Sequence, residues 1–135
     1  MPDQQAPRSG WPTSLADYLG WMDLGVRDGV YRSSMQVRPE HVAPNGYLQA
    51  AVVVALADIC CASGSFATVP AGASFTTIEL KVNLLGTALA GEVRAEAKLQ
   101  HAGRTTQVWD AVVTHTETRR KLALFRCTQL VLLPR

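Results

Sequence analysis

One carboxylate of the sequence stands where only chemistry or a dedicated partner would keep it. Asp58 lies within the apolar run LQAAVVVALADICCASGSF, residues 48–66, and no Lys, Arg or His is within one helical turn of it. Burying an unpaired carboxylate costs several kcal/mol. Such a group is typical of a general base or a nucleophile. The alternative is a structural carboxylate that accepts hydrogen bonds from a neighbouring strand, for example from Thr76 or Thr77.

Backbone donors are expected just before this run. The turn HVAPNGY contains Asn45 and Gly46, which let the chain bend sharply into a helix that begins near Ala50. The first N–H groups of a helix have no partner within the helix. Together with the positive end of the helix dipole they suit an oxyanion or a carbonyl oxygen. The alternative is an ordinary helix start whose N–H groups bind water.

The spacing between these two features has a consequence for assembly. Ala50 and Asp58 are eight residues apart, which is about 12 Å along a helix. A carboxylate and an oxyanion donor must both come within about 3 Å of the same carbonyl group. One helix cannot meet this requirement, whereas two antiparallel helices related by a two-fold axis can. If Asp58 is catalytic, we therefore expect at least a dimer with two shared sites.

The elements that must position these residues follow from hydropathy patterns. The run around Asp58 is apolar on nearly every face, which predicts a helix buried on all sides. Apolar and polar residues alternate in the four segments that follow it, as in half-buried strands. These segments are Thr76–Leu85, Glu92–His101, Thr105–Thr116 and Lys121–Leu133, and a less regular one, Gly29–Arg38, precedes the helix. Because the connections between the last four are short, we expect them to form an antiparallel meander.

One strand, one long buried helix and four antiparallel strands make an α+β fold. A sheet that covers such a helix must curve around it, which is the architecture called the hotdog fold. We expect this domain to span residues 26–135, after an N-terminal arm over residues 1–25. The arm should hold a short helix, Thr13–Leu19, with Thr13 or Ser14 as its N-cap. The 135 residues of the chain suit one such domain.

Composition excludes several classes of protein. The formal net charge is only +2 and the one basic run is Arg119–Lys121, so we expect no nucleic-acid binding. Cys60, Cys61 and Cys127 form no CxxC pair, which argues against a zinc site or a disulfide framework. The most apolar stretch, residues 47–62, is too short and too polar for a membrane span. The first ten residues lack the apolar segment of a signal peptide, so we expect a cytoplasmic protein.

Residues 41–58 resemble the hotdog-fold acyl-CoA thioesterases, in particular the family that includes phenylacetyl-CoA and 4-hydroxybenzoyl-CoA thioesterases. The family pattern is H-x-N-x-x-G-x-x-H-G-G, followed by L-x-D or L-x-E. His41, Gly46 and the tripeptide Leu56-Ala57-Asp58 match this pattern. The resemblance, which covers roughly residues 26–133, implies that Asp58 is the catalytic acid of an acyl-CoA thioesterase.

Other site residues are implied by the same resemblance. They are Gln49 and Ala50 as donors to the thioester oxygen, Thr77 as the hydroxyl that assists the carboxylate, and Asn45, Gly46, Gly103 and Arg104 as substrate-binding residues. Gly103 and Arg104 belong to a turn, HAGR, that is similar to the family's H-x-G-R near the CoA nucleotide. The alternative for Arg104 is an exposed hairpin charge. No metal or cofactor is implied, since coenzyme A is part of the substrate.

The chain departs from the family pattern at four positions, where Ala43 replaces Asn, Gln49 replaces His, and Ala50 and Ala51 replace glycines. The backbone N–H of Ala50 is retained, and the Gln49 amide can donate in place of His. The resemblance thus implies hydrolysis of a small aryl- or acyl-CoA by a homodimer or a homotetramer. One alternative is a non-catalytic module that binds acyl-CoA or dimerises. A dehydratase is a further alternative, disfavoured because no His lies in the helix or directly before it.

Overall fold

The structure is a computed structural model that describes residues 14–135. The elements in chain order are α1 (Leu15–Leu19), β1 (Met22–Arg27), β2 (Val30–Gln36), the short 3₁₀ helix η1 (Pro39–His41), α2 (Ala50–Thr68), β3 (Ser74–Leu84), β4 (Glu92–Ala102), β5 (Thr106–His115) and β6 (Arg120–Leu132). The first 13 residues of the expected arm, with Thr13 as a candidate cap, lie outside the described residues. Ser14 caps α1, and its side chain and that of Asp17 each accept a backbone N–H of the other residue.

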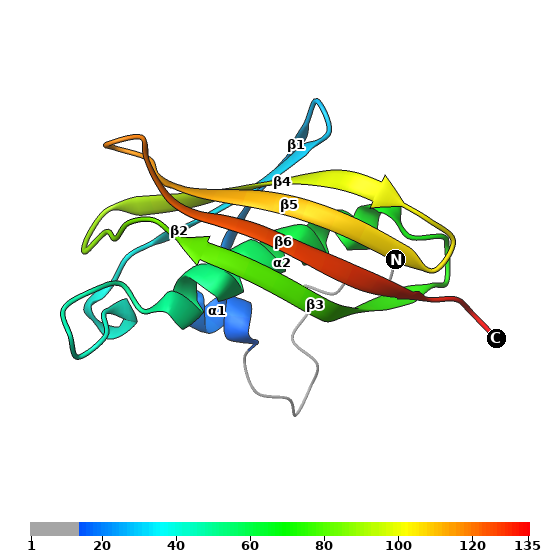
Figure 1. Ribbon diagram of the computed structural model, residues 1–135, viewed down its shortest axis with the longest axis horizontal. Coiled ribbons are helices and arrows are strands. Elements are labelled where there is room, and N and C mark those ends of the chain that lie inside the picture. The colour runs from blue at the N-terminus through cyan, green and yellow to red at the C-terminus, as the bar shows by residue number, and fades with distance from the viewer. Residues whose placement is uncertain (1–13) are drawn as a thin grey trace.

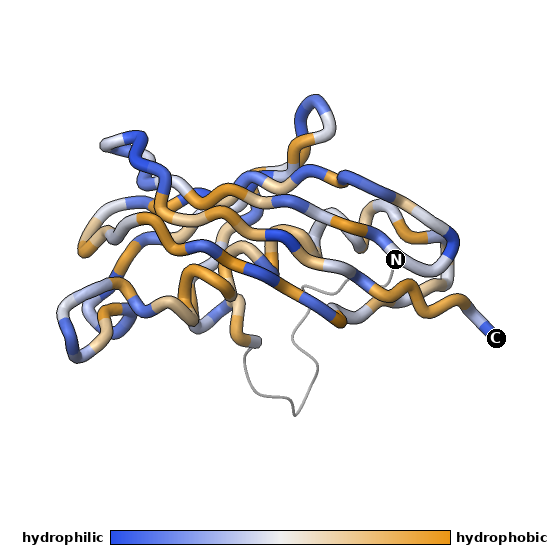
Figure 2. The backbone as a smooth tube through the Cα atoms, viewed as in Figure 1, coloured by the Kyte–Doolittle hydropathy of each residue, from blue (hydrophilic) through white to orange (hydrophobic). Residues whose placement is uncertain are grey.

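The strands form one curved antiparallel sheet with α2 lying along one face of it (Figure 1). The strand order is β1-β2-β4-β5-β6-β3. The predicted α+β class and hotdog architecture are confirmed. The predicted alternation of apolar and polar residues matches the burial of the central strands. In β4, for example, Val93, Ala95 and Ala97 are buried toward α2, while the residues between them face outward. Figure 2 shows this alternation of apolar and polar residues along the strands.

The predicted order of the strands was wrong in one respect. Among residues 14–135, β3 does not pair with β4 but lies at the edge of the sheet, where it pairs only with β6. The connection from Leu85 to Gly91 is therefore a crossover rather than a hairpin. Its backbone is held at Leu85, whose N–H donates to the carbonyl of Leu122 at 2.8 Å, and at Thr87, whose hydroxyl accepts from the Leu48 N–H at 2.8 Å. A short connection usually joins neighbouring strands in a hairpin. Here the connection crosses the end of the sheet, and these hydrogen bonds satisfy its polar groups along the way.

A sixth strand, β1, was not predicted. It spans residues 22–27, across the boundary expected between the arm and the domain, and pairs with β2 at the other edge of the sheet. All of its residues are exposed, so it shows no alternation between buried and exposed positions. Gly25 has φ +82° and interrupts the register, which further hides the strand from a pattern of period two.

The helix α2 is buried along one face only, which corrects the expectation of burial on every side. Its buried residues are Val53, Leu56, Ala57, Cys60, Cys61, Gly64 and Ser65. The opposite face, with Val54, Ala55, Asp58 and Ile59, is half-buried. By length and composition alone α2 could cross a membrane, contrary to expectation, since its mean hydropathy is 1.9. In this fold it packs lengthwise on the sheet, as a core helix does.

Candidate active site

Asp58 lies on the half-open face of α2 and is held there by one neighbour from the sheet. The hydroxyl of Thr77, on β3, donates to Asp58 Oδ1 at 3.1 Å. Burial raises the pKa of Asp58, and the hydrogen bond from Thr77 opposes this rise. Within residues 14–135 no hydrogen bond or ion pair joins Asp58 to a basic side chain. Among the described residues, no cation therefore offsets the burial of this carboxyl group.

Thr77 is turned toward the helix by the register of its strand. It pairs with Gln129 of β6, and a bulge directly after it shifts the register so that Glu79 pairs with Thr128. Ile78 occupies the bulge and is 56% exposed. Thr77 thus faces Asp58 while the strand beyond it continues as an exposed edge.

A residue that was not predicted completes this cluster. Gln129 is fully buried, and its Oε1 lies 3.0 Å from the hydroxyl oxygen of Thr77. Its Nε2 donates to the Sγ of Cys127 at 3.7 Å. The signal that could have revealed it is a polar residue at an inward position of an alternating strand, between buried Cys127 and Val131. Asp58, Thr77, Gln129 and Cys127 form a continuous polar chain from the helix face into the core.

The predicted oxyanion donors lie at the start of α2. Gln49 is the N-cap of the helix, and its exposed side chain makes no capping hydrogen bond. Its backbone N–H donates to the carbonyl of His41 at 2.8 Å. Ala50 is the first helical residue, and in the described part of the chain its N–H makes no recorded hydrogen bond. This N–H and the Gln49 carboxamide are therefore available to an oxygen atom placed at the helix start.

The loop before the helix is held by its own hydrogen bonds. Asn45 accepts the N–H of Tyr47 through its side-chain oxygen at 3.3 Å, and Gly46 has φ +88°, a conformation that favours glycine. His41 is buried, and its Nδ1 accepts the Arg38 N–H at 3.0 Å. Burial, then the Arg38 charge, lower the pKa of His41. Asn45, Gly46 and His41 therefore stabilise the conformation of this loop.

Gly103 and Arg104 form the turn between β4 and β5. The Gly103 N–H donates to the carbonyl of Thr106 at 2.8 Å, and Arg104 is exposed. Arg104 lines an open depression of about 490 Å³ together with Arg135 and apolar residues near the end of β6. This turn and the start of α2 lie toward opposite ends of the long axis of the chain (Figure 1).

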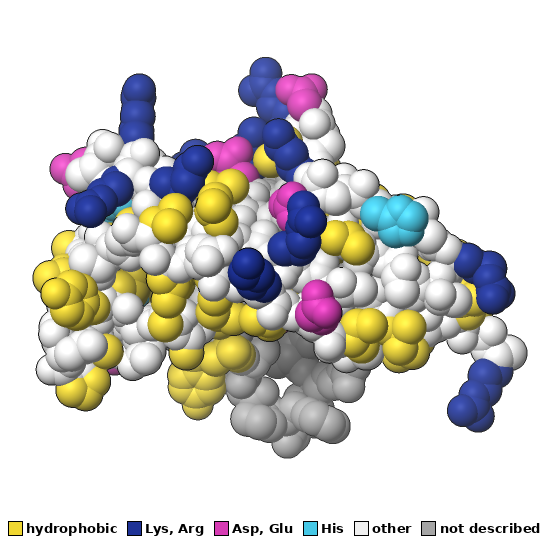
Figure 3. Space-filling model, in the orientation of Figure 1, with side chains coloured by type: hydrophobic (Ala, Val, Ile, Leu, Met, Phe, Trp, Pro, Cys, Tyr) yellow, Lys and Arg dark blue, Asp and Glu magenta, His cyan; other side chains and the backbone are white. Residues whose placement is uncertain are grey.

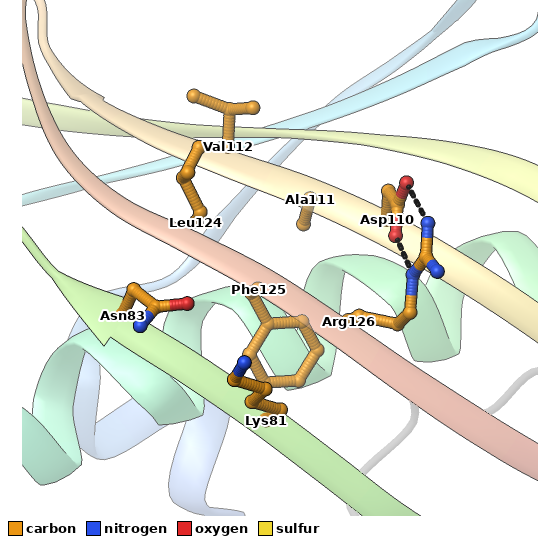
Figure 4. Close-up of a pocket in the computed structure, with 8 residues that line it drawn as sticks. All are labelled: Lys81, Asn83, Asp110, Ala111, Val112, Leu124, Phe125 and Arg126. Atoms are coloured by element: carbon orange, nitrogen blue, oxygen red, sulfur yellow. Dashed lines mark hydrogen bonds and ion pairs between the residues drawn. The ribbon is translucent and has the colours of Figure 1, made fainter.

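Of the predicted residues, a single chain brings only Asp58 and Thr77 into contact. The start of α2 is separated from Asp58 by two turns of continuous helix, and the turn at Arg104 is remote from that start. A depression of about 350 Å³ lies on the other face of the sheet, over β3, β5 and β6 (Figure 4). It holds an ion pair between Asp110 and Arg126 rather than the candidate site. Acidic and basic side chains are interspersed on that face (Figure 3).

The three cysteines are buried free thiols. The adjacent thiol of Cys127, and then burial, raise the pKa of Cys61, while burial raises the pKa of Cys60 to about 11. Neutral thiols of this kind serve as small apolar residues and weak hydrogen-bonding groups. In residues 14–135 no group of three or more His, Cys, Asp and Glu side chains is arranged to hold a metal ion.

Comparisons with known proteins show similarity to thioesterases over most of the chain. A sequence model described as "Thioesterase superfamily" matches residues 45–121, which include the start of α2, Asp58 and Thr77. The 1,4-dihydroxy-2-naphthoyl-CoA hydrolase of Listeria monocytogenes is 31% identical over 114 residues, which cover 84% of this chain and 92% of that protein.

Two solved structures extend the similarity to nearly the whole fold. A mutant thioesterase from Pseudomonas aeruginosa superposes with a TM-score of 0.84 at 29% identity, over 88% of this chain and 86% of that one. A mutant thioesterase enzyme from Staphylococcus aureus superposes with a TM-score of 0.84 at 26% identity, over 90% and 100% of the two chains.

Proposed function

The chain belongs to the thioesterase superfamily and is a hydrolase of acyl-CoA thioesters, and from this premise we propose that it acts through Asp58 at a site shared by two copies of the chain. We further propose that its substrates are small aryl- or acyl-CoA thioesters. Aromatic acyl groups come first, because the relative from Listeria monocytogenes is named for an aromatic acyl-CoA.

In the proposed reaction the thioester carbonyl binds at the start of α2. The Ala50 N–H donates to the carbonyl oxygen, and the Gln49 carboxamide supplies a second N–H. Both donors gain strength as negative charge develops on that oxygen in the tetrahedral intermediate. The methyl group of Ala50 narrows the approach to its N–H compared with glycine, which favours substrates with a slender group next to the carbonyl.

Asp58 acts as the general base in this proposal. It takes a proton from a water molecule as the water oxygen bonds to the carbonyl carbon, and collapse of the intermediate then breaks the C–S bond and releases the CoA thiolate. A carboxyl group whose pKa is raised by burial suits this role better than the role of direct nucleophile, because a base works best when its pKa is near the working pH. Thr77 donates to Asp58 Oδ1 and so orients the carboxyl group toward the water.

A shared site follows from the distance along α2 between the oxyanion donors and Asp58. The helix start and Asp58 are two turns apart on one rigid helix, so a second antiparallel copy of α2 is needed to bring a helix start to each carboxylate. The half-open face of α2 and the neighbouring edge strand β3 are the surfaces we assign to this contact. β3 pairs on one side only and exposes Leu80 and Leu84 by 43% and 48%.

The observation that carries the proposal is the hydrogen bond between Thr77 and Asp58, on the open face of a helix that is otherwise apolar. The experiment is release of free thiol from a panel of aryl- and alkyl-CoA thioesters, including 1,4-dihydroxy-2-naphthoyl-CoA. Wild type is compared with Asp58→Asn and with the matched control Asp110→Asn, which removes an ion-paired carboxylate on the outer face of the sheet.

We expect Asp58→Asn to lower kcat/KM at least about a hundredfold, the scale of a lost acid–base group. The control should retain the wild-type value. Equal activity of all three proteins would overturn the role of Asp58 but leave the family assignment in place.

A further inference from the structure

The hydroxyl group of Thr77 lies between two oxygen atoms that both accept hydrogen bonds. Asp58 Oδ1 is 3.1 Å away and Gln129 Oε1 is 3.0 Å away. A hydroxyl has one hydrogen, so Thr77 donates to one of these oxygens at a time. Which oxygen accepts this hydrogen depends on whether Asp58 or Gln129 donates a hydrogen bond to the Thr77 oxygen.

Gln129 can offer either end of its amide. With Oε1 toward Thr77, the amide accepts the hydroxyl hydrogen, and the Thr77 oxygen is free to accept from a protonated Asp58. With the amide rotated by half a turn, Nε2 donates to the Thr77 oxygen and the hydroxyl hydrogen goes to an ionised Asp58. The first arrangement suits the acid and the second suits the carboxylate.

Cys127 makes both orientations of the amide acceptable. Gln129 is fully buried, so the end of the amide that turns away from Thr77 needs a partner. That end meets the Cys127 Sγ, at 3.7 Å from Nε2. A neutral thiol accepts weakly from N–H and donates weakly to C=O, so neither orientation leaves a buried amide atom without a partner.

We propose that Gln129 is a positioning residue that matches the hydrogen bond of Thr77 to the protonation state of Asp58. This rests on the proposed function, in which Asp58 gains a proton from water during the reaction. The amide then accepts from Thr77 just when Thr77 must accept from Asp58. Gln129 does not touch the substrate and acts only through Thr77.

Two thiols lie on the elements that carry Asp58 and Gln129. The thiol of Cys61 follows along the same helix, and the thiol of Cys127 faces it from β6; the adjacent thiol and burial raise the pKa of Cys61. From β3 the group that faces Asp58 is the neutral hydroxyl of Thr77. In the described residues the hydrogen-bonded chain is therefore the route by which the sheet acts on this carboxyl group.

The test replaces the amide without changing the length of the side chain greatly. Gln129→Met removes the donor and the acceptor, and Gln107→Met is its matched control. Gln107 is the register partner of Gln129 on β5 and is nearly as buried, but it contacts Thr68 and Trp109 instead of Thr77. Both variants are compared with wild type by carbon-13 NMR titration of the Asp58 carboxyl carbon, which requires no turnover, and by steady-state kinetics.

In Gln129→Met a protonated Asp58 would leave the Thr77 hydroxyl without an acceptor, so we expect the pKa of Asp58 to fall by about one unit. We expect kcat to fall about tenfold with KM unchanged, because the reaction passes through the protonated acid. Gln107→Met should match wild type in the titration and in kcat. Gln129→Leu gives the same measurements if the Met variant does not fold.

A second cycle tests the route of action. If Gln129 acts through Thr77, then Gln129→Met should change neither the titration nor kcat in a Thr77→Val background. An unchanged Asp58 titration in Gln129→Met, or an equal shift in Gln107→Met, would overturn the inference. Absence of thioester hydrolysis in wild type would instead overturn the proposed function, and the titration would still decide the role of Gln129.

Discussion

Gly64 on α2 faces the indole ring of Trp109 on β5 so closely that a Cβ atom on the glycine would lie 2.3 Å from the ring carbon Cη2. Trp109 is fully buried and donates its indole N–H to Gln107 at 3.0 Å, and Tyr31 packs edge-on against it. The ring therefore cannot move aside without breaking these contacts. This contact limits how closely α2 approaches the sheet at Gly64, six residues after Asp58 along the helix.

Gly64→Ala should accordingly destabilise the protein although alanine is the better helix former. Overpacking of a tight core costs about 1–3 kcal/mol, which exceeds the gain of about 1 kcal/mol from helix propensity. The measurement is urea unfolding, with Ser63→Ala as the control on the adjacent, half-buried position. A Gly64→Ala variant as stable as the control would mean that the helix and Trp109 separate more easily than this packing implies.

The stability of the protein should depend on pH through Asp58. Since burial raises its pKa in the folded state, the stabilising protonated form is complete below the ordinary value of 3.8 and is lost as the pH rises through the folded value. Asp58→Asn removes a carboxylate that is costly at neutral pH, so we expect it to be more stable than wild type there by about 1 kcal/mol. Thermal unfolding at pH 7 and at about pH 3 should show this advantage shrinking in acid. A variant less stable than wild type at pH 7 would indicate a structural carboxylate.

Loss of the Thr77 hydroxyl should move the activity profile toward higher pH. The hydrogen bond from Thr77 lowers the pKa of Asp58 against the effect of burial, so Thr77→Val should raise that pKa further. We expect the acidic limb of the kcat/KM profile to shift upward and kcat to fall about tenfold. Thr76→Val, at the exposed neighbouring position, is the control. Identical profiles for the two variants would exclude Thr77 from the site.

The N–H of Ala50 can be removed with little effect on the fold. Ala50 is the first helical residue, where proline is tolerated, and Gln49 before it has φ −59° and ψ 125°, which a following proline accepts. We expect Ala50→Pro to lower kcat about a hundredfold or more, as loss of an oxyanion donor does. Circular dichroism should show an unchanged helix content.

The same variant tests whether the site is shared. Asp58→Asn and Ala50→Pro should each be inactive alone, but a hybrid of the two chains would hold one site with both residues intact. We therefore expect co-expression to restore activity, up to about half of wild type per hybrid dimer. No recovery in a purified hybrid would place the carboxylate and the donor in the same chain.

Arg104 should affect binding of the nucleotide part of the substrate and not the chemistry. Arg104→Ala is expected to raise KM for CoA thioesters about tenfold with kcat nearly unchanged, as a lost phosphate contact does. Thioesters of N-acetylcysteamine, which lack the nucleotide, should react equally with both proteins. Arg119→Ala, on the exposed β5–β6 turn, is the control. An unchanged KM would leave Arg104 as an exposed hairpin charge.

Local patterns predicted most of the elements, because each depends on residues close in sequence. The alternation in β4 and the continuous apolar run of α2 reflect burial against one layer. The neighbours of β3 could not be predicted in this way, since alternation shows which face is buried but not which strand lies alongside. β1 was not predicted, because all of its residues are exposed and its sequence therefore shows no apolar face.

Residues of the candidate site were predictable where a polar side chain stands within an otherwise apolar segment. Asp58 was found by this contrast, and the contact with Thr77, one of two hydroxyl residues considered, is confirmed. Gln129 obeys the same rule but was missed, because only charged residues were weighed against their apolar neighbours. The proposed contact between a helix start and the carboxylate needs a second copy of α2, so no pattern within one chain could show its geometry.

The pairing of β3 with β6 has a consequence for the order in which the protein forms. During synthesis β3 leaves the ribosome 36 residues before the first residue of β6, its partner in the described sheet, since β3 ends at Leu84 and β6 begins at Arg120. The strand and the apolar helix before it must therefore wait in an incomplete sheet, and contacts this distant in sequence close slowly. Nascent chains that stall before β6 would expose the unpaired backbone groups of β3. Chaperones could bind this edge, and neighbouring nascent chains on a polysome could associate through it.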